Sequence, residues 1–169
     1  MIHTIINKSK TCITKAFALL ALSFAFVACQ SDIEDTLTYY PSLSENDATY
    51  YIDAENGNDT NDGLTEATAW QSLARGSVIF MQGGNKILLK RGATFKGQLA
   101  PKGSGTPNNP IIIGAYGEGE RPKLDGEGLV NGVVYIKNES NWVVQDLEVV
   151  NYADERGGTY RSGILIENL

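Results

Sequence analysis

Short apolar runs separated by clusters of glycine and asparagine make up most of the chain from Thr49 onward. Runs of this kind, bounded by turn residues, are typical of β-strands. Helical patterns do not alternate with them, which argues against a doubly wound α/β fold. The sequence therefore predicts an all-β body. The predicted strands are 50–52, 86–90, 94–99, 110–116, 133–137, 143–144, 147–150 and 163–167.

One stretch of the body, residues 65–75, has a helical pattern instead. Thr68 and Gln71 have the spacing of a capping box, in which two side chains exchange hydrogen bonds with the backbone at the start of a helix. Trp70 and Leu73 would then lie on one face of that helix. We expect a single short helix over 65–75.

Two of the predicted strands, 133–137 and 163–167, repeat each other. Val134 matches Ile164 and Ile136 matches Ile166, and both segments then continue to a charged residue and an asparagine, Asn138 in the first. Stacked coils of a solenoid explain such a repeat, because inward branched residues would stack on the same type in the next coil and the asparagines would form a ladder. A β-sandwich with a coincidental likeness is the alternative.

The N-terminal region has a different pattern. Lys8, Lys10 and Lys15 precede an apolar run at 16–28 that contains one polar residue, Ser23. That run is well short of the ~20 apolar residues that span a bilayer. A basic start followed by an apolar core of this length is typical of a secretory signal peptide, and a buried core helix is the alternative.

Cys29 follows the apolar run directly. The segment Phe26-Val27-Ala28-Cys29 resembles a bacterial lipoprotein lipobox, although the family usually has Leu where Phe26 stands. The resemblance implies a lipoprotein signal peptide at 1–28, cleavage before Cys29 and attachment of lipid to its sulfur. A plain secreted protein with a free thiol is the alternative. Cys12, the second cysteine, and His3, the single histidine, lie in the signal peptide, so a Cys/His zinc site is excluded from the mature body.

The mature chain is acidic. The whole sequence has a formal net charge of −6, and the remainder is more negative still, because residues 1–28 contain three lysines and no acidic residue. An acidic balance argues against nucleic acid as a partner. Residues 29–48 lack glycine and basic residues and read as an acidic tether. The segment 31–35 is similar to the acidic export tags of some Gram-negative surface lipoproteins, so we expect an exported outer-membrane lipoprotein, with the cell surface as an open possibility.

The body also carries a family resemblance. Residues 50–64 (Tyr-Tyr-Ile-Asp-Ala-Glu-Asn-Gly-Asn-Asp-Thr-Asn-Asp-Gly-Leu), followed by Ala69-Trp70-Gln71-Ser72-Leu73, look like the N-terminal cap of right-handed parallel β-helix proteins of the pectin-lyase-like superfamily. Residues 87–97, 110–117 and 122–126 look like its first coils. The resemblance implies that 49–169 form an N-terminal cap with one short helix and the first two or three coils of a solenoid. Gly83-Gly84-Asn85 departs from the usual Pro-Gly-Asp.

The resemblance also bears on function. The superfamily contains polysaccharide lyases, glycoside hydrolases and non-catalytic surface proteins, so the leading hypothesis is a lipid-anchored β-helix protein of polysaccharide breakdown. Its partners would be a polysaccharide and, through the lipid, the membrane. Family enzymes carry catalysis on the middle coils, so we expect the chain to be an N-terminal fragment that is inactive alone. The alternatives are a non-catalytic module that binds glycan or protein, and a non-functional remnant.

Three aspartates, Asp53, Asp59 and Asp62, crowd the polar loop after the first predicted strand. Calcium takes several oxygen ligands, so the loop is a candidate calcium site. The spacing does not match an EF-hand, and a solvated turn is the alternative.

A second group of candidates lies in the insertion before the last strand. Arginine grips a carboxylate with two parallel hydrogen bonds, and tyrosine can stack on a sugar face. This insertion is therefore a candidate substrate-facing loop, with an ordinary exposed loop as the alternative. Its residues are Asp154, Glu155, Arg156, Tyr160 and Arg161.

A third candidate is the carboxylate pair Asp146 and Glu148. They are two residues apart, so on one strand they would point outward together. Paired carboxylates are suited to acid/base work on glycosidic bonds, and a solvated strand face is the alternative.

Overall fold

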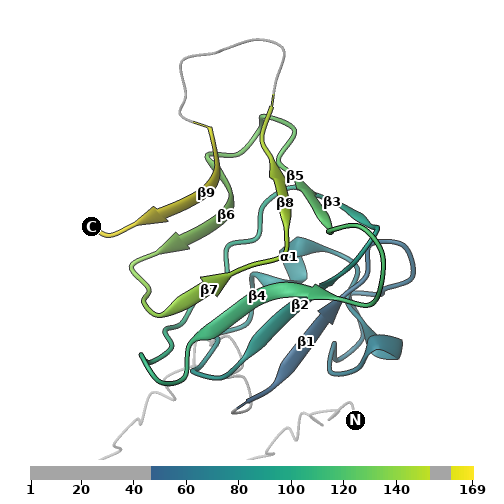
Figure 1. Ribbon diagram of the computed structural model, residues 1–169, viewed down its shortest axis with the longest axis horizontal. Helices are drawn as coiled ribbons and strands as arrows, with labels where there is room; N and C mark the ends of the chain where they lie inside the picture. Colours follow the sequence, from purple (N-terminus) through teal and green to yellow (C-terminus); the bar gives the residue numbers. More distant parts are fainter. Residues whose placement is uncertain (1–46, 153–160) are drawn as a thin grey trace, which may run out of the picture. The chain divides into compact units, whose positions relative to one another are not determined.

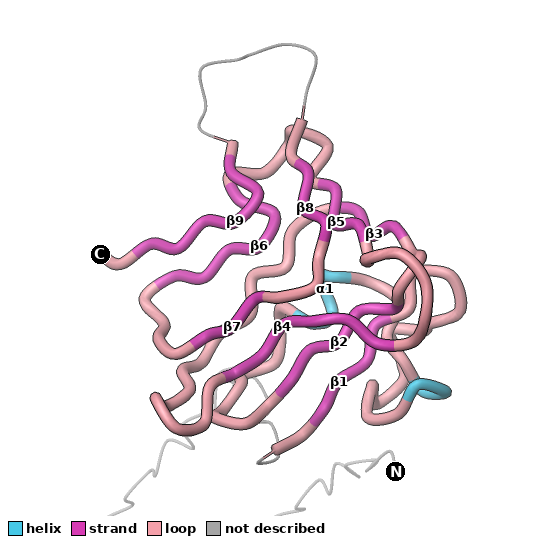
Figure 2. Tube along the Cα trace, in the orientation of Figure 1, coloured by secondary structure: helices cyan, strands magenta, loops and turns pink. Residues whose placement is uncertain are grey.

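The computed structural model describes residues 47–152 and 161–169, which consist mostly of strands with two single helical turns (Figure 2). The helices in these ranges are too short to cross a membrane. The strands are β1 (Thr49–Ile52), β2 (Lys86–Lys90), β3 (Thr94–Lys96), β4 (Ile111–Tyr116), β5 (Lys123–Asp125), β6 (Gly132–Lys137), β7 (Trp142–Val144), β8 (Glu148–Val150) and β9 (Ser162–Glu167). The prediction of an all-β body is confirmed.

The strands form three sheets in which every pair is parallel. The first sheet has the order β1-β2-β4-β7, the second β3-β5-β8 and the third β6-β9. Leu99 extends the third sheet by a parallel bridge to Val134. Figure 1 shows the three sheets arranged around a common interior. Parallel sheets are compatible with a β-helix and differ from the antiparallel sheets of a β-sandwich.

The chain visits the sheets in rotation. It passes from β2 to β3, then through β4, β5 and β6, and then through β7, β8 and β9. Each strand therefore pairs with the strand of the previous pass. The pairing of β6 with β9 places Val134 opposite Ile164 and Ile136 opposite Ile166, so the register inferred from the internal repeat is confirmed.

The predicted asparagine ladder takes another form. Asn138 has φ 57°, in the left-handed region that asparagine tolerates better than most residues. Its Oδ1 accepts a hydrogen bond from the backbone N–H of Leu169 at 2.8 Å, and its own N–H donates to the carbonyl of Glu167. The asparagine thus ties two passes together through the backbone.

Alternate residues of the strands point into the interior and make up the core. In β2, Ile87 and Leu89 are fully buried while Lys86 is exposed. Phe95 of β3 and Leu124 of β5 are buried in the same cluster. Removal of these large apolar side chains from water stabilises the fold.

The region predicted as one helix is divided into two turns, and the prediction of a continuous helix over 65–75 is wrong. A 3₁₀ turn, η1 (Glu66–Thr68), precedes a single α-helical turn, α1 (Leu73–Gly76). Between them Trp70 is extended: its N–H donates to Tyr51 and its carbonyl accepts from Asp53. Strand-like pairing with β1 outweighs the local helical pattern, because it stacks the Trp70 ring on Tyr50 at 4.9 Å.

The capping box lies three residues earlier than predicted. Thr65 is the N-cap of η1, and its hydroxyl accepts from the N–H of Thr68 while the Thr68 hydroxyl accepts from the N–H of Thr65. Ser72 caps α1 by accepting from the N–H of Arg75. Thr68 is thus the third helical residue of one turn and not the cap of a longer helix.

The remaining strand predictions differ by more than one residue in two places. The strand predicted at 94–99 ends at Lys96, because Gly97 has φ 100° and turns the chain. β5 is not among the predicted strands, because three residues between Pro122 and Gly126 are too few to form a recognisable pattern. Its place is decided by the partners on either side, β3 and β8.

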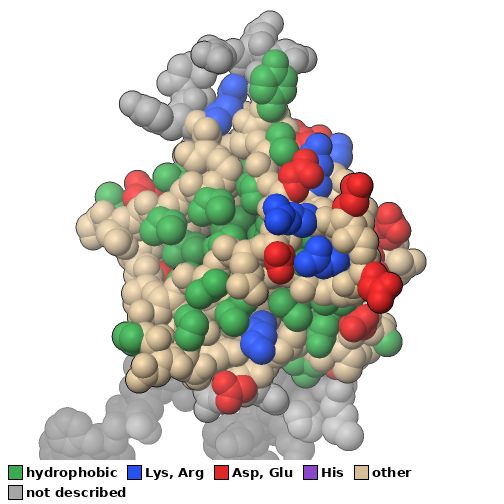
Figure 3. Space-filling view, viewed as in Figure 1, with side chains coloured by type: hydrophobic (Ala, Val, Ile, Leu, Met, Phe, Trp, Pro, Cys, Tyr) green, Lys and Arg blue, Asp and Glu red, His purple; other side chains and the backbone are tan. Residues whose placement is uncertain are grey.

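The last pass of the chain leaves one face of the interior open. Ile136 of β6 is 1% exposed, whereas Ile166, its partner on β9, is 64% exposed. Trp142, Val144 and Val149 are partly buried on the same face. Figure 3 shows hydrophobic side chains gathered between β7, β8 and β9. We call this the open apolar face.

Candidate functional site

The outward side of the third sheet carries a polar groove. In β6, Val134 and Ile136 point into the core, so Tyr135 and Lys137 point outward. Lys102 and Lys137 both line the groove, and a parallel bridge joins Leu99 to Val134, the residues that stand three positions before each lysine. The sheet therefore gathers side chains that are distant in sequence.

The groove encloses about 350 Å³. We call it the third-sheet groove, and its lining is Ala100, Pro101, Lys102, Tyr135, Lys137, Asn138 and Glu139. The lining mixes one aromatic ring with hydrogen-bond donors and acceptors. Such a lining suits a saccharide, because sugars present both apolar ring faces and hydroxyl groups.

Hydrogen bonds fix the groove's tyrosine and both nearby carboxylates. The Tyr135 hydroxyl donates to Glu167 Oε2 on the neighbouring strand at 2.5 Å. This bond raises the pKa of Tyr135, because the carboxylate stabilises the protonated phenol. Ser104 Oγ donates to Glu139 Oε2 at 2.8 Å. Tyr135 and both carboxylates are thus held in place.

The polar loop after β1 uses its aspartates as hydrogen-bond acceptors. Asp59 accepts from the N–H groups of Gln71 and Ser72 and from the Ser72 hydroxyl, at 2.6–2.9 Å. Burial alone would raise the pKa of Asp59, but these bonds and the nearby Arg75 lower it. Asp59 therefore fixes the loop on the start of α1.

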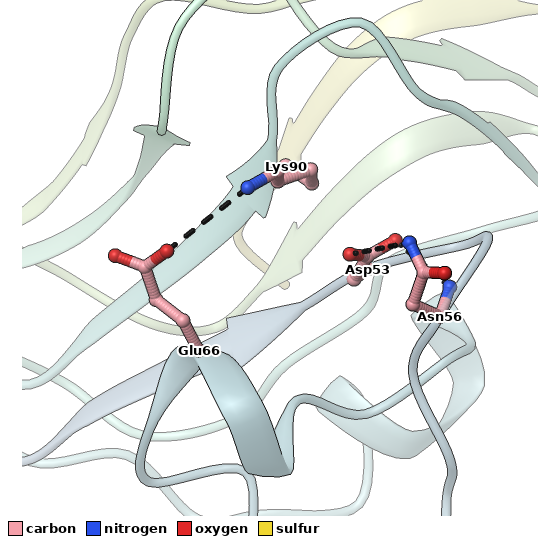
Figure 4. Close-up of polar contacts among 4 residues, drawn as sticks. All are labelled: Asp53, Asn56, Glu66 and Lys90. Carbon is pink, nitrogen blue, oxygen red and sulfur yellow. Dashed lines mark hydrogen bonds and ion pairs between the residues drawn. The ribbon is translucent and has the colours of Figure 1, made fainter.

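Asp53 has a similar role at the start of the loop. Its Oδ1 accepts from the N–H groups of Glu55 and Asn56, and its Oδ2 accepts from the Asn56 amide (Figure 4). Burial opposes ionisation here too, but the hydrogen bonds and the charge of Lys90 lower the pKa of Asp53 overall. Lys90 itself points to Glu66 at 4.0 Å.

The third aspartate of the calcium prediction, Asp62, accepts from the N–H of Leu64 and from the Thr68 hydroxyl. Within residues 47–152 and 161–169, no three His, Cys, Asp or Glu side chains come together as metal ligands. The structure therefore gives each aspartate a role in the loop's own hydrogen bonding, and the calcium prediction gains no support from the geometry.

A buried tyrosine lies beside the same cluster. Tyr116 of β4 is 7% exposed, and its hydroxyl makes no hydrogen bond within the described residues. The Lys90 ammonium lies 4.9 Å from the centre of its ring. Burial, together with the charges of Asp53 and Glu66, raises the pKa of Tyr116 to about 12.

Asp146 and Glu148 do not share a strand as predicted. Asp146 lies at the corner between β7 and β8 with φ 57°, and its carboxylate pairs with Arg91 at 3.5 Å. Glu148 begins β8 and is exposed. The corner breaks the alternation on which the prediction of a common outward face depends.

The predicted substrate-facing loop is only partly described. Asp154, Glu155, Arg156 and Tyr160 lie outside the described residues, as does Cys29. Arg161 is half-buried and directly precedes β9. Whether this loop meets a sugar stays a prediction.

Sequence reasoning does not single out the residues of the third-sheet groove. The signal is present in the internal repeat, because the positions between its inward residues must point outward. Tyr135 and Lys137 pair in register with Leu165 and Glu167. Lys102 lies in an irregular segment, and no local pattern indicates its bridges, Phe80 with Lys102 and Leu99 with Val134.

No family model matches the chain. Over 112 residues, or 64% of its length, it is 31% identical to a lacto-N-biosidase of Bifidobacterium longum subsp. longum, of which the match covers 7%. The native crystal structure of GH136 lacto-N-biosidase from Eubacterium ramulus matches with a TM-score of 0.57 and 26% identity, over 64% of this chain and 21% of that one. The chain thus resembles a segment of glycoside hydrolases much longer than itself. None of these matches names the pectin-lyase-like superfamily, and that resemblance stays a prediction.

Proposed function

We propose that the chain is the lipid-anchored N-terminal part of an exported carbohydrate-active protein, a glycoside hydrolase of the lacto-N-biosidase kind. The observation that carries the proposal is the agreement of sequence and fold with two lacto-N-biosidases over the same share of the chain. The similarity of the chain to these glycoside hydrolases favours hydrolysis of a glycosidic bond over lyase chemistry.

The fold proposed for this protein is a right-handed parallel β-helix. Three parallel sheets visited in rotation, with the repeat of β6 carried in register onto β9, support stacked coils. The open apolar face supports further coils in the whole protein, because it would expose Ile164 and Ile166 to water without them. The matched relatives are long enough to supply such coils.

The role proposed for the chain within the whole protein is to hold saccharide, with catalysis carried by other coils. The third-sheet groove supports binding by its tyrosine ring and its mixed donors and acceptors. The same groove favours the second candidate function, a glycan-binding module without catalysis. The two candidates differ in what happens to the bound sugar.

An assay on protein from the native host separates these functions. An antibody against residues 30–48 would capture the protein, which would be given a chromogenic lacto-N-bioside and a panel of unmodified oligosaccharides. We expect release of the chromophore by a captured protein much larger than 18.3 kDa. Glycan binding by the captured protein without release of any sugar would favour the binding module. Neither binding nor release would contradict the proposed function.

The lipid anchor is tested through the two cysteines. Cys29→Ser should abolish incorporation of labelled fatty acid and release the protein from the membrane fraction. Cys12→Ser is the matched control, because that residue lies in the expected signal peptide and should leave labelling unchanged. Labelling that survives in Cys29→Ser would contradict the anchor.

A further inference from the structure

The third-sheet groove contains two lysines that make no ion pair with the described residues around them. Lys102 and Lys137 are exposed, and both line the groove. Neither ammonium makes an ion pair or hydrogen bond with the described residues. An exposed ammonium group without an ion pair is available to an anionic ligand that enters the groove.

The acidic residues close to the lysines are already engaged. Glu167 is opposite Lys137 in register, but its carboxylate accepts the Tyr135 hydroxyl. Glu139 accepts from Ser104. Both carboxylates keep their negative charge, but each is held by an uncharged donor and makes no ion pair with Lys102 or Lys137, so the two ammonium groups can contact a ligand directly.

We propose that the third-sheet groove binds the anionic group of an acidic saccharide, a carboxylate or a sulfate ester, between Lys102 and Lys137. The proposal rests on the proposed function for the class of ligand and goes beyond it by naming the charge. Tyr135 offers its ring to the sugar face beside the anion, with its orientation fixed by Glu167. The amide nitrogen of Asn138 is a further donor, since its Oδ1 already accepts from Leu169.

The test is binding of the full chain to an array that carries uronate-bearing, sulfated and neutral oligosaccharides. We expect retention of acidic sugars over neutral ones, and weaker retention as salt rises from about 50 to about 300 mM, because screening acts on exposed charges. Binding to uronates alone, or to sulfated sugars alone, would identify which anion the groove takes.

Two double variants of equal charge locate the site. Lys102→Gln with Lys137→Gln should lower affinity for acidic sugars roughly tenfold, the loss expected for two solvent-exposed ionic contacts. Lys86→Gln with Lys123→Gln removes the same charge from the first and second sheets and should leave affinity unchanged. An unchanged melting temperature would show that both variants fold.

A single substitution tests the role of the tyrosine. Tyr135→Phe keeps the ring but frees the Glu167 carboxylate beside Lys137, so binding of acidic sugars should weaken while binding of neutral sugars should not. Retention of neutral sugars as strongly as acidic ones, or equal losses in the two double variants, would overturn the inference and leave the proposed function standing. Binding to no sugar at all would overturn both.

Discussion

The open apolar face makes a quantitative prediction about two equivalent isoleucines. Ile136 and Ile166 occupy the same position in successive passes of the chain and pair with each other in register. Ile136 is 1% exposed and Ile166 is 64% exposed. Truncation to alanine removes the same atoms at both positions, so a difference in cost reports how far each side chain is buried.

The expected costs follow from these exposures. A fully buried isoleucine truncated to alanine costs about 2–5 kcal/mol, from lost transfer free energy and the cavity that remains. Ile136→Ala should lie in that range. Ile166 buries roughly a third of its surface and leaves no enclosed cavity, so Ile166→Ala should cost about 1 kcal/mol or less. The ratio of the two costs should therefore be about two or more.

The assay is urea unfolding of the full chain and both variants, followed by circular dichroism. The slope of each urea transition is fitted separately, so that a change in the unfolded state would be visible as a change in slope. Equal costs for the two variants would refute the reasoning, because they would mean that Ile166 is as buried as Ile136. In the whole protein proposed above, further coils would cover Ile166, and there the two costs should converge.

Four further outcomes are expected. Gly63→Ala should destabilise the chain by more than Gly92→Ala: both have positive φ, but only at Gly63 would a methyl group meet the Trp70 ring, at 2.3 Å, and equal melting temperatures would contradict this packing. Tyr116→Phe should raise the melting temperature, since an unpaired buried hydroxyl costs about 1–3 kcal/mol, and a lower melting temperature would reveal a missing partner. The pKa of tyrosine is about 10 in the unfolded chain and about 12 for folded Tyr116. The ionisation of Tyr116 should therefore leave the free energy of unfolding unchanged below about pH 10 and lower it as the pH rises through about 12. Thermal unfolding of wild type and Tyr116→Phe at alkaline pH checks this difference. Calcium at about 1 mM should leave the melting temperature unchanged, and a rise would restore the calcium site by ligand linkage.

Local sequence is enough to predict much of the strand pattern. Alternation of apolar residues is a local property, so β2 is predicted with its observed ends and β6 and β9 to within one residue. The register between β6 and β9 also follows from sequence, because the repeat is measured along the chain and the parallel pair places its like residues opposite one another. The all-β class needs nothing more.

Long-range pairing prevails where it disagrees with local preference. Trp70 fits a helix by its spacing, yet pairing with β1 keeps it extended, because its ring stacks on Tyr50, a partner outside the predicted helix. By their spacing in the sequence, the aspartates of the loop after β1 likewise suit a metal site. The folded structure shows that Asp59 accepts a hydrogen bond from Ser72, the N-cap of α1.

The candidate site depends on the tertiary structure most of all. Tyr135 and Lys137 can be assigned to the outward side from the alternation of β6 alone. Lys102 joins them from an irregular segment of the previous pass, which is held by the bridges of Leu99 to Val134 and of Lys102 to Phe80. No single stretch of sequence contains this site, because two passes of the chain each contribute part of its lining and only the pairing between them brings the parts together.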